Sequence, residues 1–200
     1  MKTALNLLKI AAAATLLATA GAQATTIDFD AASVTSQLTH ISLPNSYWGS
    51  SYVEDGFLLQ SSAWLPNSLV VAGNSLSAGS YAMGATPLAT TTLTGASAFS
   101  IGSIDLRRGF SFSNWSVTFT GTKADASTVT QSFSLNNTNW NTFTFGAGFS
   151  NLTSLSWDEG ALRVYAFDNI NVTAVPEPET YAMLLAGLGL VALARRRKSA

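Results

Sequence analysis

Alternation between apolar and hydroxyl residues is the feature of this sequence that most limits its fold. In residues 115–120, WSVTFT, every second side chain is large and apolar. A period of two places these side chains on one face of a β-strand and the hydroxyl side chains on the other. The same alternation recurs in residues 128–135, 142–145 and 155–157. The sequence therefore predicts half-buried β-strands in the C-terminal half.

Turn-forming residues separate these strands at intervals of roughly ten residues, a spacing typical of antiparallel sandwiches and barrels. They are Gly121 with Lys123 and Asp125, Asn136 with Asn137 and Asn139, Gly146 with Gly148, and Asp158 with Glu159 and Gly160. We expect an all-β, antiparallel, jelly-roll-like β-sandwich, in which a first strand at residues 26–30 pairs near a last strand at residues 162–173. Residues 44–49 are expected to form a long aromatic loop, and residues 67–92 to form short strands or loops.

The N-terminus has the layout of a secretory signal peptide. Lys2 and Lys9 precede an apolar run at residues 10–17, and Ala22 and Ala24 form a small-x-small triplet with the residue between them. A positive region, an apolar region and a small-residue cleavage site are the three parts that signal peptidase substrates share. We expect signal peptidase to cut after Ala24, and a signal peptide at residues 1–24.

The C-terminus carries three blocks in a fixed order. The first is the segment Val175, Pro176, Glu177, Pro178 and Glu179, followed by an apolar stretch at residues 181–194 and then by Arg195, Arg196, Arg197 and Lys198. The two prolines exclude a regular strand or helix and favour an exposed, extended linker. The apolar stretch predicts a short helix, below the roughly 20 residues usual for a membrane span. Cationic flanks stay in the cytoplasm, so the tail is expected to hold the preceding domain outside the cell by its membrane helix.

This order of blocks resembles the PEP-CTERM sorting tail of Gram-negative bacteria, which is read by the membrane-embedded transpeptidase exosortase. The resemblance implies that exosortase cuts near the Pro-Glu-Pro segment and that the domain is released or attached to the cell surface. It also implies organisms that make exopolysaccharide and grow as biofilms or flocs. A plain C-terminal membrane anchor is the alternative. We expect a sorting segment at residues 175–200 and one ectodomain at residues 25–174.

Composition excludes several classes of function. The chain has a formal net charge of −1, and most of its cations lie in the two terminal segments, so the ectodomain is mildly acidic. Without a basic patch to neutralise phosphates, nucleic-acid binding is not expected. The absence of cysteine removes disulfides, thiol catalysis and cysteine-ligated metal sites.

Catalysis is not expected from the residues present. His40 is the single histidine, and no Gly-x-Ser-x-Gly pattern accompanies it, which disfavours a Ser-His-Asp triad. Paired carboxylates could hydrolyse a glycosidic bond across a cleft. The candidates are Glu54, Asp55, Asp158 and Glu159, all in turn-like sequence beside a glycine. The sequence thus leaves a secreted polysaccharide hydrolase as an alternative to a protein without enzymatic activity.

A structural calcium ion is a further hypothesis. Strict alternation in residues 167–172 would place Asp168 on the same face as Ile170 and Val172, where a charge needs a partner. Many jelly-roll carbohydrate-binding modules hold a structural calcium ion between an acid of the first strand and one of the last, and this segment resembles that arrangement. That resemblance implies that Asp28 or Asp30 is the calcium ligand opposite Asp168. Carboxylates supply the oxygen atoms that calcium prefers as ligands. The alternative is a strand-end aspartate that hydrogen bonds to the backbone or meets solvent.

Loop aromatics are the candidate ligand contacts, because sugar rings stack on exposed aromatic rings while neighbouring polar groups bind the hydroxyls. The candidates are Tyr47, Trp48, Tyr52, Trp64 and Trp140. The alternative is that such rings close the open end of the sandwich. The leading hypothesis is an exported, exosortase-sorted surface or matrix protein that associates with exopolysaccharide, in a biofilm for example. A purely structural surface subunit without a ligand is the remaining alternative.

Overall fold

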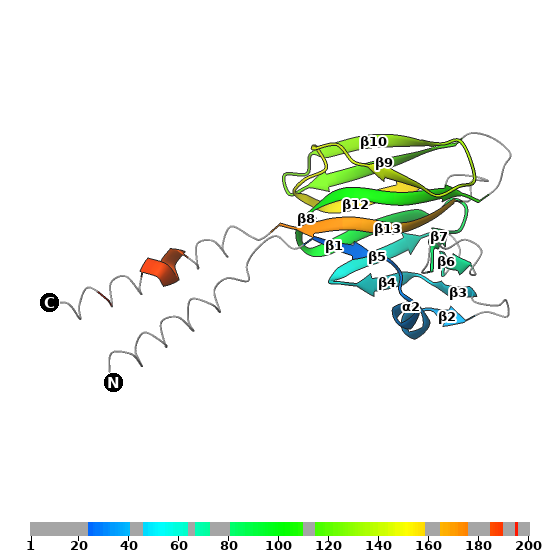
Figure 1. Ribbon diagram of the computed structural model, residues 1–200, viewed down its shortest axis with the longest axis horizontal. Helices are drawn as coiled ribbons and strands as arrows, with labels where there is room; N and C mark the ends of the chain where they lie inside the picture. The colour runs from blue at the N-terminus through cyan, green and yellow to red at the C-terminus, as the bar shows by residue number, and fades with distance from the viewer. Residues whose placement is uncertain are drawn as a thin grey trace. The chain divides into compact units, whose positions relative to one another are not determined.

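The strands expected from the alternation are present in the computed structural model shown in Figure 1. Trp115–Lys123 forms β9, whose side chains at Trp115, Val117 and Phe119 are buried while the hydroxyl side chains between them face outward. The structure describes residues 24–40, 46–63, 67–72, 81–109, 115–158, 165–175, 185–189 and 195. Residues 24–174 form one compact unit.

The described elements of this unit are thirteen strands and one short helix. In chain order they are β1 (Ala24–Ile27), α2 (Ala31–Gln37), β2 (Thr39–His40), β3 (Ser46–Gly49), β4 (Ser51–Glu54), β5 (Phe57–Ser62), β6 (Leu69–Ala72), β7 (Met83–Ala85), β8 (Thr90–Arg108), β9 (Trp115–Lys123), β10 (Thr128–Leu135), β11 (Asn141–Thr144), β12 (Leu152–Asp158) and β13 (Tyr165–Ala174). Every strand pairing is antiparallel.

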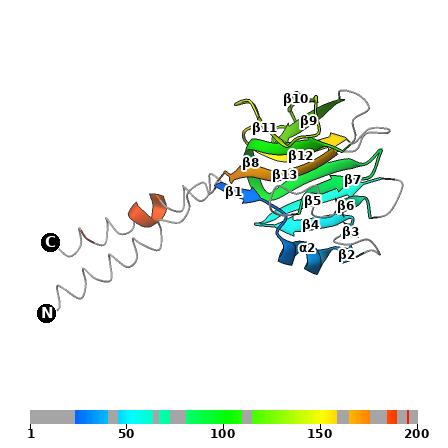
Figure 2. The ribbon, with the colours of Figure 1, turned by 45° about the vertical axis from the view of Figure 1, so that its right-hand side comes forward.

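The long strand β8 belongs to two sheets. Its residues 90–95 pair with β5 and β12, whereas its residues 99–108 pair with β13 and β11. Hydrogen bonds join all thirteen strands through β8, which divides them into two sheets. The first sheet has the order β4-β5-β8-β12-β9-β10, and the second has the order β11-β8-β13-β7-β6-β3-β2, with β1 also beside β13. Figures 1 and 2 show these strands from two directions. The jelly-roll-like, antiparallel β-sandwich expected from sequence is confirmed.

Aromatic rings join the inner faces of the two sheets. Trp157 of the first sheet packs edge-on against Phe167 of the second, with ring centroids 5.1 Å apart. Phe119 lies 5.3 Å from Trp157 and 5.2 Å from Phe145, which follows β11. All four rings are buried. Such aromatic pairs add to the free energy gained from burying their area, so this contact holds the sandwich closed.

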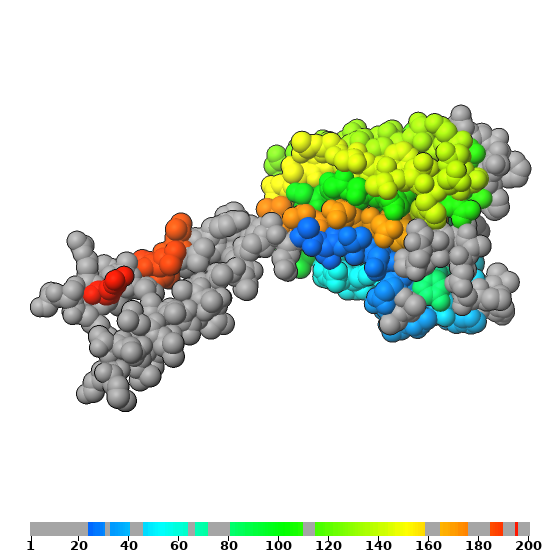
Figure 3. Space-filling view, viewed as in Figure 1, coloured from blue at the N-terminus to red at the C-terminus, as the bar shows by residue number. Residues whose placement is uncertain are grey.

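The first and last strands are neighbours, as the sequence predicted. Ala24 pairs with Thr173 and Ile27 pairs with Ile170, with two further pairs between them. Figure 3 shows the orange surface of β13 between the blue residues of β1 and the green residues of β8. The pairing means that the ectodomain begins and ends at adjacent positions in the second sheet.

Two local expectations are wrong. Tyr47 and Trp48 lie on β3, which pairs with β2 and β6, and not in a long loop. Gly121 lies inside β9 and not in a turn, because the turn comes after Lys123. A Cβ atom on Gly121 would lie 2.8 Å from a methyl carbon of Leu152, so this glycine makes room for the neighbouring strand β12.

Hydroxyl side chains cover the outer face of the first sheet. Thr120 pairs with Thr130 of β10 and with Ser156 of β12, and Ser156 pairs in turn with Thr92 of β8. These residues are half-buried or exposed. Hydroxyl side chains let the outward half of an alternating strand face water. This face offers hydroxyls and methyl groups at these positions, and no aromatic ring.

The described part of the C-terminal segment is short. Residues 185–189 are helical, and the exposed fractions of Leu185 and Leu188 are 68% and 50%. Most of the apolar helix expected at residues 181–194 lies outside the described residues. No helix within the described ranges has the length and apolar character that a membrane crossing requires.

Candidate functional site

A row of side chains crosses the outer face of the second sheet from β3 to β8. The register pairs Trp48 with Val70, and Val70 with Gly84. Ala166 pairs with Gly84 on one side and with Arg107 on the other. We name Trp48, Val70, Gly84, Ala166 and Arg107 together the binding row. Neighbouring strands lie about 4.8 Å apart, so these five residues extend over about 19 Å. The alternate residues of the same strands, which face the core, are Tyr47, Val71, Met83, Phe167 and Leu106.

The middle of the binding row is hollow because its side chains are small. Gly84 has no side chain, and a Cβ atom there would lie 3.0 Å from the carbonyl oxygen of Tyr165. Ala166 has only a methyl group. A pocket of about 210 Å³ lies over them, and Thr86 and Pro87 from the turn after β7 form part of its wall. The missing side chain at Gly84 therefore both lets β7 approach β13 closely and leaves the hollow above them.

Arg107 and Trp140 stand at the end of the row opposite Trp48. Arg107 lines the pocket, and its Nε–H donates to the carbonyl oxygen of Thr138 at 2.6 Å. Asn141, the first residue of β11, pairs with Leu106. Trp140 directly precedes this pair, as Arg107 directly follows it. The structure thus brings the half-buried Trp48 into one row with a hollow and with Arg107, and the half-buried Trp140 lies next to β11 beyond Arg107.

The other predicted aromatic contacts lie elsewhere. Tyr52 is 1% exposed and packs against Phe29 with ring centroids 5.4 Å apart, so the prediction of a ligand contact is wrong for Tyr52. Tyr47 is partly buried against the core. Trp64 lies outside the described residues. Alternation explains the difference, because adjacent residues of one strand point to opposite faces.

The predicted orientation of Asp168 is also wrong. The register of β13 is irregular after Asp168, and Asn169 has a φ of 49°. The core face therefore passes from Phe167 to Ile170, and Asp168 does not share a face with Ile170 and Val172. Asp168 is fully buried, and its carboxylate accepts a hydrogen bond from the backbone N–H of Asn169 at 2.8 Å. A β-bulge of this kind re-aims side chains along a strand.

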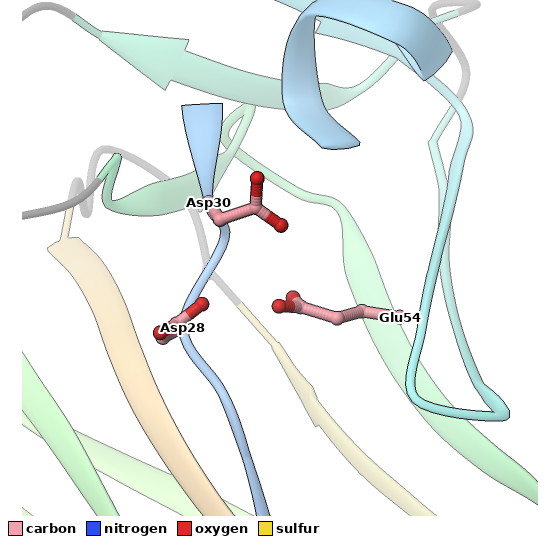
Figure 4. A group of neighbouring side chains, drawn as sticks. All are labelled: Asp28, Asp30 and Glu54. Carbon is pink, nitrogen blue, oxygen red and sulfur yellow. The ribbon is translucent and has the colours of Figure 1, made fainter. Parts of the chain in front are cut away.

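Three carboxylates form a cluster at the start of the domain. Asp28, Asp30 and Glu54 each place one oxygen within 4.8 Å of the others. Figure 4 shows Glu54, at the end of β4, pointing between the two aspartates that follow β1. Asp168 is not part of this group, so the structure brings Asp28 and Asp30 together with Glu54 and not with the acid of the last strand. The oxygen atoms are of the type that calcium takes.

Two of these acids, Asp30 and Glu54, accept hydrogen bonds from backbone N–H groups. Asp30 accepts a hydrogen bond from the N–H of Ser33 at 3.1 Å, so it caps the N-terminus of α2. Glu54 accepts one from the N–H of Phe29 at 3.1 Å and another from the hydroxyl of Tyr52 at 3.0 Å. Phe29 has a φ of 52°, an unusual value for a bulky residue. Glu54 therefore stabilises the bend that leads from β1 to α2.

Burial raises the pKa of Glu54 to about 7. The hydrogen bond from Tyr52 opposes this rise, and Asp28 adds to it through a hydrogen bond and through its charge. Burial, followed by the charge of Glu54, also raises the pKa of Tyr52 above its ordinary value. The cluster thus holds a carboxylate that changes its charge close to neutral pH.

Replacing Glu54 with glutamine is expected to remove a pH dependence of stability. Because the folded pKa of Glu54 is raised, the folded state binds more protons than the unfolded state between about pH 4.5 and 7, and stability falls as pH rises through this range. Glu54→Gln should flatten this fall and stabilise the protein by about 1–2 kcal/mol above pH 7, allowing for the group's partial exposure. Thermal unfolding of the full chain between pH 4.5 and 8 measures both effects.

Asp125→Asn is the matched control. The hydroxyl and backbone N–H of Ser127 lower the pKa of Asp125, so its effect on stability has the opposite sign and appears at acid pH. An unchanged slope between pH 4.5 and 7 in Glu54→Gln would show that the carboxylate ionises as it does in the unfolded chain.

Two of the predicted sorting residues, Val175 and Arg195, are among the described residues. Val175 is half-buried directly after β13, and Arg195 is exposed. Pro176, Glu177, Pro178, Glu179, Arg196, Arg197, Lys198 and Ala22 lie outside the described residues. Ala24, the residue expected to precede the signal peptidase cut, is the first residue of β1. Unlike the sorting residues, the members of the binding row are not contiguous in sequence, and they could be found only from strand register.

Comparison with solved structures gives matches of low similarity. A mutant of CBM29-2, a family 29 carbohydrate-binding module, has a TM-score of 0.41 and 14% identity over 77% of this chain and 92% of that chain. Another CBM29-2 mutant, complexed with mannohexaose, has a TM-score of 0.38 and 11% identity over 76% and 92%. The CBM22-1-GH10 modules of a Clostridium thermocellum xylanase, complexed with xylohexaose, have a TM-score of 0.39 and 9% identity over 60% and 26%. Similarity at this level does not transfer a ligand.

The comparison with family models concerns the C-terminal segment. No curated protein matches the chain. The model of the PEP-CTERM protein-sorting motif matches residues 174–198, which begin at the last residue of β13 and end at the last cation of the tail. The order of linker, apolar stretch and cationic cluster is therefore that of a known sorting signal, and the chain carries a PEP-CTERM protein-sorting motif at its C-terminus.

Proposed function

We propose that this chain is an exported surface or extracellular-matrix protein, sorted by exosortase, whose β-sandwich binds extracellular polysaccharide without catalysing a reaction. The sorting motif implies export and a cell-surface or extracellular location. The observation that supports polysaccharide binding is the binding row, in which Trp48 and Arg107 flank a hollow on one sheet face. An extended polymer suits a row that crosses five strands.

The chemistry of the row suits a sugar polymer. Tryptophan rings stack on the C–H faces of sugar rings, and the guanidinium of Arg107 donates hydrogen bonds to oxygen acceptors. Gly84 and Ala166 let a chain approach the backbone of the sheet. None of the described residues that line the pocket is a carboxylate, so the row holds no acid pair of the kind that glycoside hydrolysis uses.

Retention on polysaccharide tests the proposal. The full chain, purified in mild detergent, is passed over insoluble cellulose, chitin and mannan and over exopolysaccharide extracted from bacterial biofilm. Retention without release of reducing ends supports a binding protein. Release of reducing ends would favour the hydrolase alternative, and passage through every column would favour a structural subunit without a ligand.

We also propose that the cluster of Asp28, Asp30 and Glu54 can hold one calcium ion. Three carboxylates in a half-buried site repel one another, and a divalent cation relieves that repulsion as protons do. Calcium should therefore raise the unfolding midpoint of the full chain at pH 7.5, in proportion to the logarithm of its concentration well above the dissociation constant. Asp28→Asn should abolish the rise and Asp168→Asn should preserve it. If Asp168→Asn abolishes the rise and Asp28→Asn preserves it, Asp168 is a calcium ligand, as the sequence predicted. If calcium does not raise the midpoint of the parent, this cluster does not bind calcium.

A further inference from the structure

The hollow in the binding row is too apolar for a bare sugar ring. Its floor and walls include Ala82, Gly84, Ala166 and Pro87, and Arg107 is the one charged residue among the described lining residues. A hydroxyl group pressed against the alanine, glycine and proline part of this surface loses its hydrogen bonds to water and gains none there. A methyl group placed there is removed from water at no such cost. The hollow therefore discriminates between substituents of a sugar.

The hollow also has one side with a hydrogen-bond donor. Arg107 lines this side of the hollow, and its Nε–H donates to the carbonyl oxygen of Thr138 at 2.6 Å, which fixes the plane of the guanidinium. A guanidinium carries five N–H donors in a rigid plane and no acceptor, so it suits an oxygen acceptor next to the methyl group. An acyl group combines these two features within a few atoms.

We propose that this hollow binds an acetyl substituent of the polysaccharide, with the methyl group over Gly84 and Ala166 and the carbonyl oxygen toward Arg107. The inference rests on the proposed function and names its ligand class. Its volume of about 210 Å³ accommodates such a group together with part of the ring that carries it. The flanking ring of Trp48 then stacks on a neighbouring sugar, so the row recognises one acetylated sugar unit within an extended polysaccharide chain.

Paired polymers that differ only in acetylation provide the test. The first pair is O-acetylated glucomannan and the same polymer after removal of acetyl groups with mild alkali. The second pair is N-acetylated chitohexaose and its deacetylated form. The full chain should bind the acetylated member of at least one pair about tenfold or more tightly, the discrimination that one methyl group achieves in an apolar pocket. The pair that shows the difference identifies an O-acetyl or an N-acetyl group.

Ala166→Leu fills the hollow, and Thr92→Leu places the same side chain on the outer face of the first sheet as its matched control. Ala166→Leu should remove the preference for acetylated polymer while Thr92→Leu keeps it. Equal binding of both members of both pairs by the parent overturns the acetyl inference and leaves polysaccharide binding intact. Absence of binding to any polymer, including cellulose, mannan and biofilm exopolysaccharide, overturns the proposed function itself. The comparison on the parent needs no variant, so it stands even where Ala166→Leu fails to fold.

Discussion

Trp48→Ala is expected to lower the affinity of the full chain for its polysaccharide by about 30-fold or more, the loss typical of a tryptophan at the energetic centre of an interface. Trp48 is half-buried on the outer face of β3, in register with the hollow over Gly84 and Ala166. Truncation removes the ring on which a sugar stacks and leaves the rest of the row in place. Isothermal titration with a soluble oligomer of the retained polymer measures the loss.

Two controls separate binding from folding. Trp48→Phe keeps an aromatic face and should recover part of the affinity, because stacking depends on the ring and not on the indole N–H. Thr130→Ala changes an exposed side chain on the outer face of the first sheet and should leave affinity unchanged. The binding row is the wrong surface if Trp48→Ala binds as the parent does while its unfolding midpoint is also unchanged.

Replacing both Pro176 and Pro178 with alanine is expected to abolish most sorting. β13 ends at Ala174, and the two prolines that follow it in the sequence favour an extended linker, the form of chain that processing enzymes bind. Alanine removes this restraint and favours continuation of the helix that includes residues 185–189. Immunoblots of cell fractions should show the uncut chain accumulating in the membrane fraction and little protein at the surface or in the medium.

A second variant distinguishes cutting from membrane retention. Changing Arg195, Arg196, Arg197 and Lys198 to glutamine leaves the linker intact and removes the cationic flank that stays in the cytoplasm. This variant should escape retention and appear uncut outside the inner membrane. Normal processing of the double proline variant would show that exosortase does not require an extended linker, and the prolines would then have no part in recognition.

Much of the fold was predictable from local pattern. The strands β9 and β10 follow from strict alternation, and the pairing of β1 with β13 follows from the expectation of a closed sandwich. The bend of β8 was not predictable, because the strand passes between the sheets without a proline or a turn sequence. The strand at Tyr47 and Trp48 was missed because four residues are too few to show a period.

The candidate site was predicted in part. Residue type alone identifies Trp48 and Trp140, but not the hollow between them, because Gly84 and Ala166 are ordinary residues until β7 and β13 are paired. The sequence marks Glu54 only as a turn carboxylate, and its place beside Asp28 and Asp30 depends on the return of β4 toward the first strand. The prediction for Asp168 fails at one β-bulge, since a single extra residue reverses every side chain that follows it.

The all-β class and the sorting signal could be read from the amino-acid order without a structure. Both depend on residues that are adjacent in the sequence. The alternation of a strand is local, and the sorting motif is a contiguous linker, apolar stretch and cationic cluster. Which side chains share a face depends on the folded arrangement, because strand register brings together residues that are remote in sequence. Trp48, Gly84 and Ala166 lie on one row for that reason, and hydrogen bonding between strands is the physical cause.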